Sequence, residues 1–188
     1  KSELTPKMSD YKTHQNKINI YHFVILLFKL LKKKEIIVAA DGAATVVPNQ
    51  VGYLNKGVNY IANSGSASMG YDLPAAIGAA LSSPKRRIIC LAGDGSIMMN
   101  LQELQTIKNL NLNIIIFIIN NDGYLSIKQT QKNFFKREYG ASSKSGLSFP
   151  DFTKVAKSYG IKTIDLNIKN WKKKLSFISS KARGPLLI

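Results

Sequence analysis

The sequence contains few of the residues on which several common kinds of site are built. Its 188 residues include one cysteine, Cys90, and two histidines, His14 and His22. A single cysteine excludes an intrachain disulfide framework and a cysteine-ligated zinc site. Two histidines near the N-terminus leave the rest of the chain without an imidazole. The sequence therefore disfavours Ser–His and Cys–His catalysis and histidine-ligated metals.

Acidic residues are also scarce. Asp and Glu total 11 against 27 Lys and Arg, which gives a net charge of +16. The basic excess lies in residues 1–35 and 128–188, whereas residues 36–127 have no net charge. Lys outnumbers Arg 23 to 4, although nucleic-acid binders usually exploit Arg forks and interleaved aromatics. We expect no nucleic-acid partner, and a basic nucleic-acid-binding module stays as a minor alternative.

No hydrophobic run is long enough to cross a membrane. The most apolar run, residues 20–31, is interrupted by Lys29. As a helix it would span about 18 Å, whereas a bilayer core is about 30 Å thick. We therefore expect a buried or interface helix within a linker or arm over residues 1–35, no membrane partner, and a cytoplasmic location.

The rest of the chain alternates between strand and helix patterns. Nearly continuous apolar runs at 36–40, 87–92 and 113–119 predict strands buried on both faces, with weaker runs at 162–166 and 185–188. Helices are expected over 73–81, 97–107, 151–159 and 170–180, with Ser96 as the cap of the second. Residues 36–188 therefore predict one α/β domain, a doubly wound and mainly parallel sheet with helices on both faces. Residues 136–149 are expected to form a mobile loop over the sheet edge.

Polar residues follow three of the predicted strands. They are Asp41-Gly42, Gly93-Asp94-Gly95-Ser96 and Asn120-Asn121-Asp122-Gly123. Ligands of open parallel sheets bind beyond the carboxyl ends of the strands. Mg²⁺ would be octahedrally coordinated by the Asp94 carboxylate, the Asn121 amide oxygen, the Gly123 carbonyl, two diphosphate oxygens and a water. Asn121 follows Asp94 by 27 positions, which suits one helix and one strand.

These motifs resemble those of a known family. Residues 93–106, GDGSIMMNLQELQT, with Asn120-Asn121, are similar to the thiamine-diphosphate motif of the acetohydroxyacid synthase and 2-oxoacid decarboxylase superfamily. Residues 63–78, NSGSASMGYDLPAAIG, resemble the segment that precedes it. The resemblance covers residues 36–188 and implies the C-terminal, diphosphate-binding domain of a longer enzyme with thiamine diphosphate and Mg²⁺ as cofactors.

The resemblance also implies roles for individual residues. Asp94, Asn121 and the Gly123 carbonyl would be the metal ligands. Met69 would be the apolar wedge that bends the cofactor, and the Ala67 carbonyl would accept from its 4′-amino group. The remaining implied cofactor contacts are Thr45, Gly93, Gly95, Ser96, Tyr124 and Ile127, with Ser126 also near the thiazolium. Plainer interpretations exist for several of these positions: Met69 as core, Asp41 as a strand-end cap, and Asn63 and Asn100 as partners of backbone groups.

Two departures from the family pattern bear on the substrate. Acetohydroxyacid synthases usually carry Asp-x-Gly-Gln-His, where this chain has Asp41-Gly42-Ala43-Ala44-Thr45. A family Trp corresponds to Thr130. Both favour a relative that uses another 2-oxoacid or another acceptor, in a decarboxylation with or without carbon–carbon ligation.

No catalytic residue is expected within this chain. The family's activating glutamate belongs to a pyrimidine-binding domain, and none of Glu3, Glu35, Glu103 and Glu138 lies in a motif position for that role. We therefore expect the C-terminal portion of a roughly three-domain enzyme, a homodimer or tetramer acting on a small 2-oxoacid, with FAD in the middle domain left open. A natural split subunit and a non-catalytic remnant are the alternatives.

Overall fold

The computed structural model describes residues 9, 11–12 and 16–188, so His14 and Glu3 lie outside the described residues. Helices and strands alternate along the chain, and a π-helical segment (η2) and a 3₁₀ turn (η3) follow the fourth strand. The elements are α1 (Ile20–Leu30), β1 (Ile36–Ala39), α2 (Ala43–Val51), β2 (Asn59–Ala62), α3 (Asp72–Ser82), β3 (Ile88–Gly93), α4 (Asp94–Ile97), α5 (Glu103–Asn109), β4 (Ile114–Ile119), α6 (Leu125–Thr130), η2 (Gln131–Phe135), η3 (Ser143–Ser145), α7 (Phe152–Ser158), β5 (Lys162–Thr163), α8 (Trp171–Lys181) and β6 (Leu186–Leu187).

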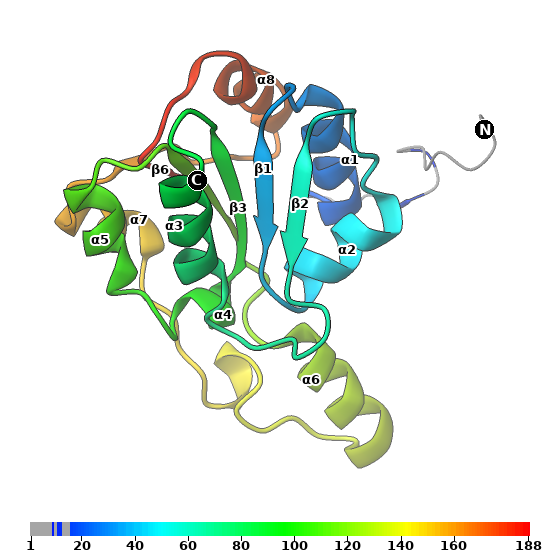
Figure 1. Cartoon of the computed structure of the whole chain (residues 1–188). Helices are drawn as coiled ribbons and strands as arrows, with labels where there is room; N and C mark the ends of the chain where they lie inside the picture. Colours follow the sequence, from blue (N-terminus) through cyan, green and yellow to red (C-terminus); the bar gives the residue numbers. More distant parts are fainter. Residues whose placement is uncertain (1–8, 10, 13–15) are drawn as a thin grey trace.

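The described strands form one parallel sheet in the order β2-β1-β3-β4-β6-β5. The central pair is β3 and β4, which stay in register from Ile88 opposite Ile114 to Gly93 opposite Ile119. Figure 1 shows helices on both faces of the sheet, with α6 extending away from the body near the carboxyl ends of β1 and β3. The predicted doubly wound α/β fold is confirmed.

Two apolar layers hold the sheet, one on each face. Alternate strand residues point to opposite faces, so Val38 belongs to the apolar layer that includes residues of α3, α5 and α7, while its neighbour Ile37 belongs to the layer that includes residues of α1, α2 and α8. Both residues are fully buried. Strands buried on both faces need apolar residues at every position, which explains the uninterrupted Ile, Val and Leu runs.

The apolar run at residues 20–31 forms α1, which packs on the sheet. Asn19 caps the helix by accepting from the N–H groups of Tyr21 and His22. Phe23, Val24 and Phe28 are buried against the second apolar layer. Within the part of the chain that the structure describes, no helix is long and apolar enough to cross a bilayer.

Five elements were not predicted: β2, α2, α6, η2 and η3. The edge strand β2 is short and only partly buried, so it lacks a continuous apolar run. The helix α2 contains Thr45, Val46, Val47 and Pro48, residues of low helix propensity. It forms because Val47 and Val51 are buried in the layer beneath α1, and tertiary packing overrides local preference.

The single helix expected from residue 97 to residue 107 is wrong. The chain forms two short helices, α4 and α5, separated by turns at residues 98–102. Ser96 therefore lies inside α4 and is not a cap. Ile97, Leu104 and Ile107 are nevertheless fully buried, so the apolar spacing marks the core while the backbone turns between the two helices.

A buried ion pair joins the sheet to α8. Arg87 contacts Glu35 through its guanidinium, with its Nε donating to Glu35 Oε1 at 2.6 Å. The same guanidinium donates to carbonyl oxygens in the last turn of α8, those of Ile178, Ser179 and Ala182. Both side chains of the pair are nearly buried. Arg87 thus neutralises a buried carboxylate and also binds carbonyls at a helix C-terminus.

We predict that Arg87→Ala lowers the free energy of unfolding by about 3–5 kcal/mol, because it leaves the Glu35 carboxylate buried without its cation. Urea unfolding followed by circular dichroism measures this. Lys85→Ala, at an exposed position in the same turn, is the control and should change stability by less than about 0.5 kcal/mol. Equal stabilities of the two variants would contradict the assignment.

Candidate functional site

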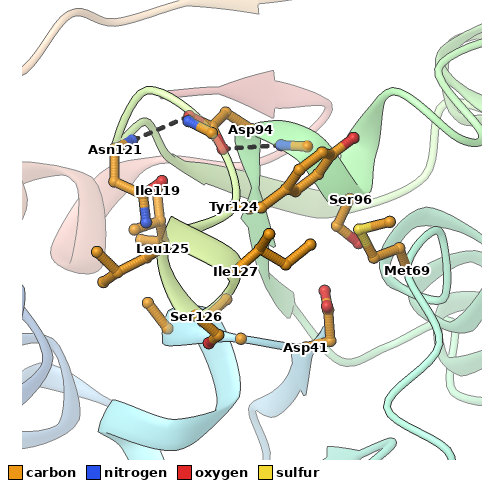
Figure 2. Close-up of a pocket in the computed structure, with 16 residues that line it drawn as sticks. Asp41, Met69, Asp94, Ser96, Ile119, Asn121, Tyr124, Leu125, Ser126 and Ile127 are labelled. Carbon is orange, nitrogen blue, oxygen red and sulfur yellow. Dashed lines mark hydrogen bonds between the residues drawn. The ribbon is translucent and has the colours of Figure 1, made fainter. Parts of the chain in front are cut away.

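An open cleft lies at the carboxyl ends of β1, β3 and β4. Its volume, including the open mouth, is about 540 Å³. Figure 2 shows side chains converging on it from four separate segments. The lining residues are Asp41, Gly42, Ala43, Ala44, Met69, Gly93, Asp94, Gly95, Ser96, Ile119, Asn121, Gly123, Tyr124, Leu125, Ser126 and Ile127.

Asp94 links the ends of the two central strands. Its Oδ1 accepts from the Gly95 N–H at 2.8 Å. Its Oδ2 accepts from the N–H groups of Asn121 and Gly123, at 3.0 Å each. The side chain is 1% exposed. A carboxylate has about four acceptor positions, so three backbone bonds leave one available for a ligand.

Asn121 carries an acceptor that nothing in the described structure satisfies. Its Oδ1 is buried and has no hydrogen-bond partner, while its backbone N–H is bound to Asp94. Leaving a buried polar atom unpaired costs about 1–3 kcal/mol. Mg²⁺ takes carboxylate and neutral oxygens, so the Asp94 carboxylate, this amide oxygen and the Gly123 carbonyl fit a magnesium ion. Clusters of three or more His, Cys, Asp or Glu are absent from the described residues, and this ligand set needs only one carboxylate.

The loop that carries Asn121 and Gly123 is braced from outside the cleft. Asp122 accepts from the Ser143 hydroxyl at 2.9 Å, and this bond holds the pKa of Asp122 below its usual value. Lys128 Nζ donates to the carbonyls of Asn121 and Asp122. A Cβ on Gly123 would come within 2.2 Å of the Ala141 carbonyl oxygen, and its φ is +113°. Only glycine fits there, so the segment after residue 136 packs directly on the loop after β4.

Tyr124 lies over the start of α4. A Cβ on Gly95 would come within 2.2 Å of the Tyr124 ring, so the ring packs directly on the Gly95 backbone. The Tyr124 N–H donates to the Ala141 carbonyl at 3.0 Å, which fixes the base of the side chain. Figure 2 shows the ring between Asp94 and Ser96.

The structure brings most of the sequence-predicted residues to the cleft. Two lie elsewhere. Thr45 is buried in α2 and its hydroxyl donates to the Ala40 carbonyl, so that hydroxyl is occupied within the fold. Ala67 is exposed in the β2–α3 segment with φ +49° and does not line the cleft. The predicted residues in the lining are Met69, Gly93, Asp94, Gly95, Ser96, Asn121, Gly123, Tyr124, Ser126 and Ile127.

Asp41 lines the cleft together with residues that sequence reasoning did not place there, Ile119 and Leu125. Burial raises the pKa of Asp41, and a hydrogen bond with the Ser96 hydroxyl offsets part of the rise. The sequence marks Asp41 as a candidate for the cleft because it directly follows a predicted strand. No comparable signal marks Ile119 or Leu125, which reach the cleft through the geometry of the loop after β4.

Asp72 is a second carboxyl near Ser96. It is fully buried, its Oδ1 accepts from the Leu73 N–H, and its Oδ2 has no hydrogen-bond partner. Burial raises the pKa of Asp72, the nearby Ser96 hydroxyl lowers it in part, and the Asp41 charge raises it further. The Ser96 hydroxyl thus lies near two carboxyls, those of Asp41 and Asp72.

Comparison with known protein families identifies the domain. Residues 41–188 match the family model described as "Thiamine pyrophosphate enzyme, C-terminal TPP binding domain". The chain belongs to this family. The match begins at Asp41, the first residue of the cleft lining, and it includes every metal and diphosphate contact that the sequence predicted.

Curated relatives are large subunits of acetolactate synthases. The chain is 46% identical to that of Cyanidium caldarium over 130 residues, which are 69% of this chain and 22% of the relative. It is 36% identical to that of Buchnera aphidicola subsp. Schizaphis graminum over 154 residues, 82% of this chain and 27% of the relative. The isozyme 1 large subunit of Escherichia coli is 38% identical over 114 residues, 61% of this chain and 20% of the relative. The chain thus spans about a quarter of the length of these relatives.

We predict that Asp72→Asn stabilises the protein at neutral pH, because the raised pKa means that the folded state disfavours the ionised carboxyl. The free-energy cost of ionising the buried Asp72 carboxyl is absent below the unfolded pKa of 3.8. It grows as the pH rises from that value to the folded pKa, and it is constant at higher pH. The gain of the variant over the wild type should therefore shrink as pH falls from 7 to 4.

Urea unfolding at both pH values measures the gain. The same substitution at the exposed Asp165 controls for the loss of one negative charge. A gain that does not depend on pH, or that appears equally in Asp165→Asn, would contradict the prediction.

Proposed function

We propose that this domain anchors the diphosphate of thiamine diphosphate through Mg²⁺ held by Asp94, Asn121 and the Gly123 carbonyl. Figure 2 shows Asn121 and Asp94 at one end of the cleft and Met69 at the other, with the apolar side chain of Ile127 between them. A charged end and an apolar end suit a ligand with a diphosphate and an organic ring system.

The observation that carries the proposal is the unpartnered Asn121 Oδ1 beside Asp94. A fold that leaves an amide oxygen buried and unbound loses stability unless a ligand binds there. The oxygen lies where two parallel strands end, the position at which such sheets bind ligands. Magnesium accounts for the oxygen, for the remaining acceptor position of Asp94 and for the family match together.

When bound, thiamine diphosphate supplies the electron sink that allows a 2-oxoacid to lose CO₂. The residues of this chain bind and orient the cofactor. Asp94 and Asn121 hold the metal, while Lys128 and the Asp122–Ser143 hydrogen bond keep the loop after β4 in shape. Met69 and Ile127 present apolar surface to the cleft.

Proton transfer requires groups from outside this chain. Among the described residues, no glutamate lines the cleft: Glu35 pairs with Arg87, Glu103 begins α5 and Glu138 accepts from Ser142. We therefore propose a pyrimidine-binding domain, of the same or a partner subunit, as the source of the activating glutamate. A homodimer or tetramer would supply it, and the length of the relatives leaves room for a further domain that could carry FAD.

The proposed reaction is acetolactate-synthase-like decarboxylation of a small 2-oxoacid, with carbon–carbon ligation or simple decarboxylation. The relatives' printed names support this class. The segment from Asp41 to Thr45 differs from the usual Asp-x-Gly-Gln-His, and in the structure Thr45 is turned to Ala40 and away from the cleft. This difference supports a substrate or acceptor other than that of valine biosynthesis. A non-catalytic remnant or split subunit is the alternative.

We predict that Asn121→Ala weakens Mg²⁺-dependent binding of thiamine diphosphate more than about tenfold without lowering the free energy of unfolding. Alanine removes a metal ligand but also removes the unpaired buried oxygen, so stability should stay unchanged or rise by about 1 kcal/mol. Calorimetric titration with Mg²⁺ and with EDTA, together with urea unfolding, measures both effects.

Asn121 is a sharper test than Asp94, because Asp94→Ala would also release three backbone N–H groups and disturb the fold. Asn133→Ala, at an exposed position in η2, is the matched control and should bind as the wild type does. Wild-type binding that is insensitive to EDTA, or Asn121→Ala binding equal to the control, would overturn the metal assignment. No binding by the wild type would favour the remnant.

A further inference from the structure

The β2–α3 segment that carries Met69 is exposed along most of its length and fixed at its end. Residues 64–69 are exposed, whereas Gly70, the next residue, is buried. Met69 lines the cleft and is 38% exposed. Figure 2 shows its side chain beside Ser96. The position of Met69 in the cleft therefore depends on how the Gly70 backbone is held.

Side chains from the segment that follows Asp94 bind both polar groups of Gly70. The Gly70 N–H donates to Ser96 Oγ at 2.9 Å. Asn100 Nδ2 donates to the Gly70 carbonyl oxygen at 2.7 Å. Ser96 lies in α4 and Asn100 lies in the turns before α5. A short stretch of chain that begins at the metal ligand Asp94 thus holds Gly70 from both sides.

The approach of the two segments is close. Gly70 has φ +81°, and a Cβ at this position would come within 2.7 Å of Met99 Cβ and 2.8 Å of Asn100 Nδ2. A side chain cannot be accommodated, so the backbone of Gly70 itself lies against the turn. This contact also explains why the chain turns between α4 and α5: the turn places the Asn100 amide at the Gly70 carbonyl.

We propose that Asn100 is a positioning residue for the bound cofactor. Its side chain is not part of the cleft lining and binds the Gly70 backbone instead. Through Gly70 it fixes Met69 relative to Asp94, and hence the apolar end of the cleft relative to the metal end. A ligand that engages both ends gains affinity when their separation is set before binding. This inference rests on the proposed function.

The test compares two ligands on the full chain by calorimetry, each with Mg²⁺: thiamine diphosphate, which would occupy both ends, and inorganic pyrophosphate, which would occupy only the metal end. Asn100→Asp keeps the shape of the side chain but replaces the donating amide with a carboxylate. We expect it to weaken thiamine diphosphate binding about tenfold and pyrophosphate binding less than about twofold. Asn100→Ala should show the same two changes in affinity, and it replaces Asn100→Asp in the test if that variant does not fold.

Gln105→Glu is the matched control, since it makes the same change of amide to carboxylate at an exposed position of α5. It should bind both ligands as the wild type does. If Asn100→Asp loses affinity equally for the two ligands, the domain is generally disturbed and the proposal is overturned. The proposal is also overturned if Asn100→Asp loses affinity for neither ligand. A wild type that binds neither ligand would overturn the proposed function as well, which distinguishes the two failures.

A double-mutant comparison tests whether Asn100 acts through Met69. If it does, Asn100→Asp combined with Met69→Ala should bind thiamine diphosphate within about twofold of Met69→Ala alone. Independent losses that multiply in the double variant would show that Asn100 acts by another route, and the proposal would fall.

Discussion

The Asp94 carboxylate is the group on which the cleft depends. It lies at the end of β3 and accepts backbone N–H groups from Gly95 and from two residues of the loop after β4, Asn121 and Gly123. Adjacent parallel strands end side by side, but the loops that leave them diverge unless something holds them together. One nearly buried carboxylate does so here, and it keeps one acceptor position without a backbone partner. Charge-assisted hydrogen bonds of this kind are among the stronger ones in proteins.

The same part of the fold holds polar groups whose burial costs free energy. Asn121 Oδ1 and Asp72 Oδ2 are both buried without partners, and the pKa values of Asp41 and Asp72 are raised by burial. An unpaired amide oxygen and two desolvated carboxyls are costs that a purely structural domain would avoid. Such costs gather at functional sites, and binding of a cation would offset the first of them directly.

The central strands and the meeting of Asp94 and Asn121 at their ends could be predicted from the sequence because each leaves a local pattern. Continuous Ile and Val runs mark β3 and β4, and polar residues mark where they end. The remaining features depend on contacts distant in sequence. Helix α2 forms despite Pro48 because α1 packs on it, and the apolar spacing from Ile97 to Ile107 conceals the turn that places Asn100 on Gly70. The Thr45 hydroxyl binds the Ala40 carbonyl, which no motif could reveal.

We have proposed that Asp94, Asn121 and Gly123 form a metal site at the end of the two central strands. A crystal structure of the chain grown with Mn²⁺ and thiamine diphosphate tests it most directly, because anomalous scattering locates the metal without reference to any assumed ligand. We expect one strong anomalous peak within bonding distance of the Asp94 carboxylate, Asn121 Oδ1 and the Gly123 carbonyl. A cofactor bound with the metal elsewhere, or with Asn121 Oδ1 still unpartnered, would contradict it.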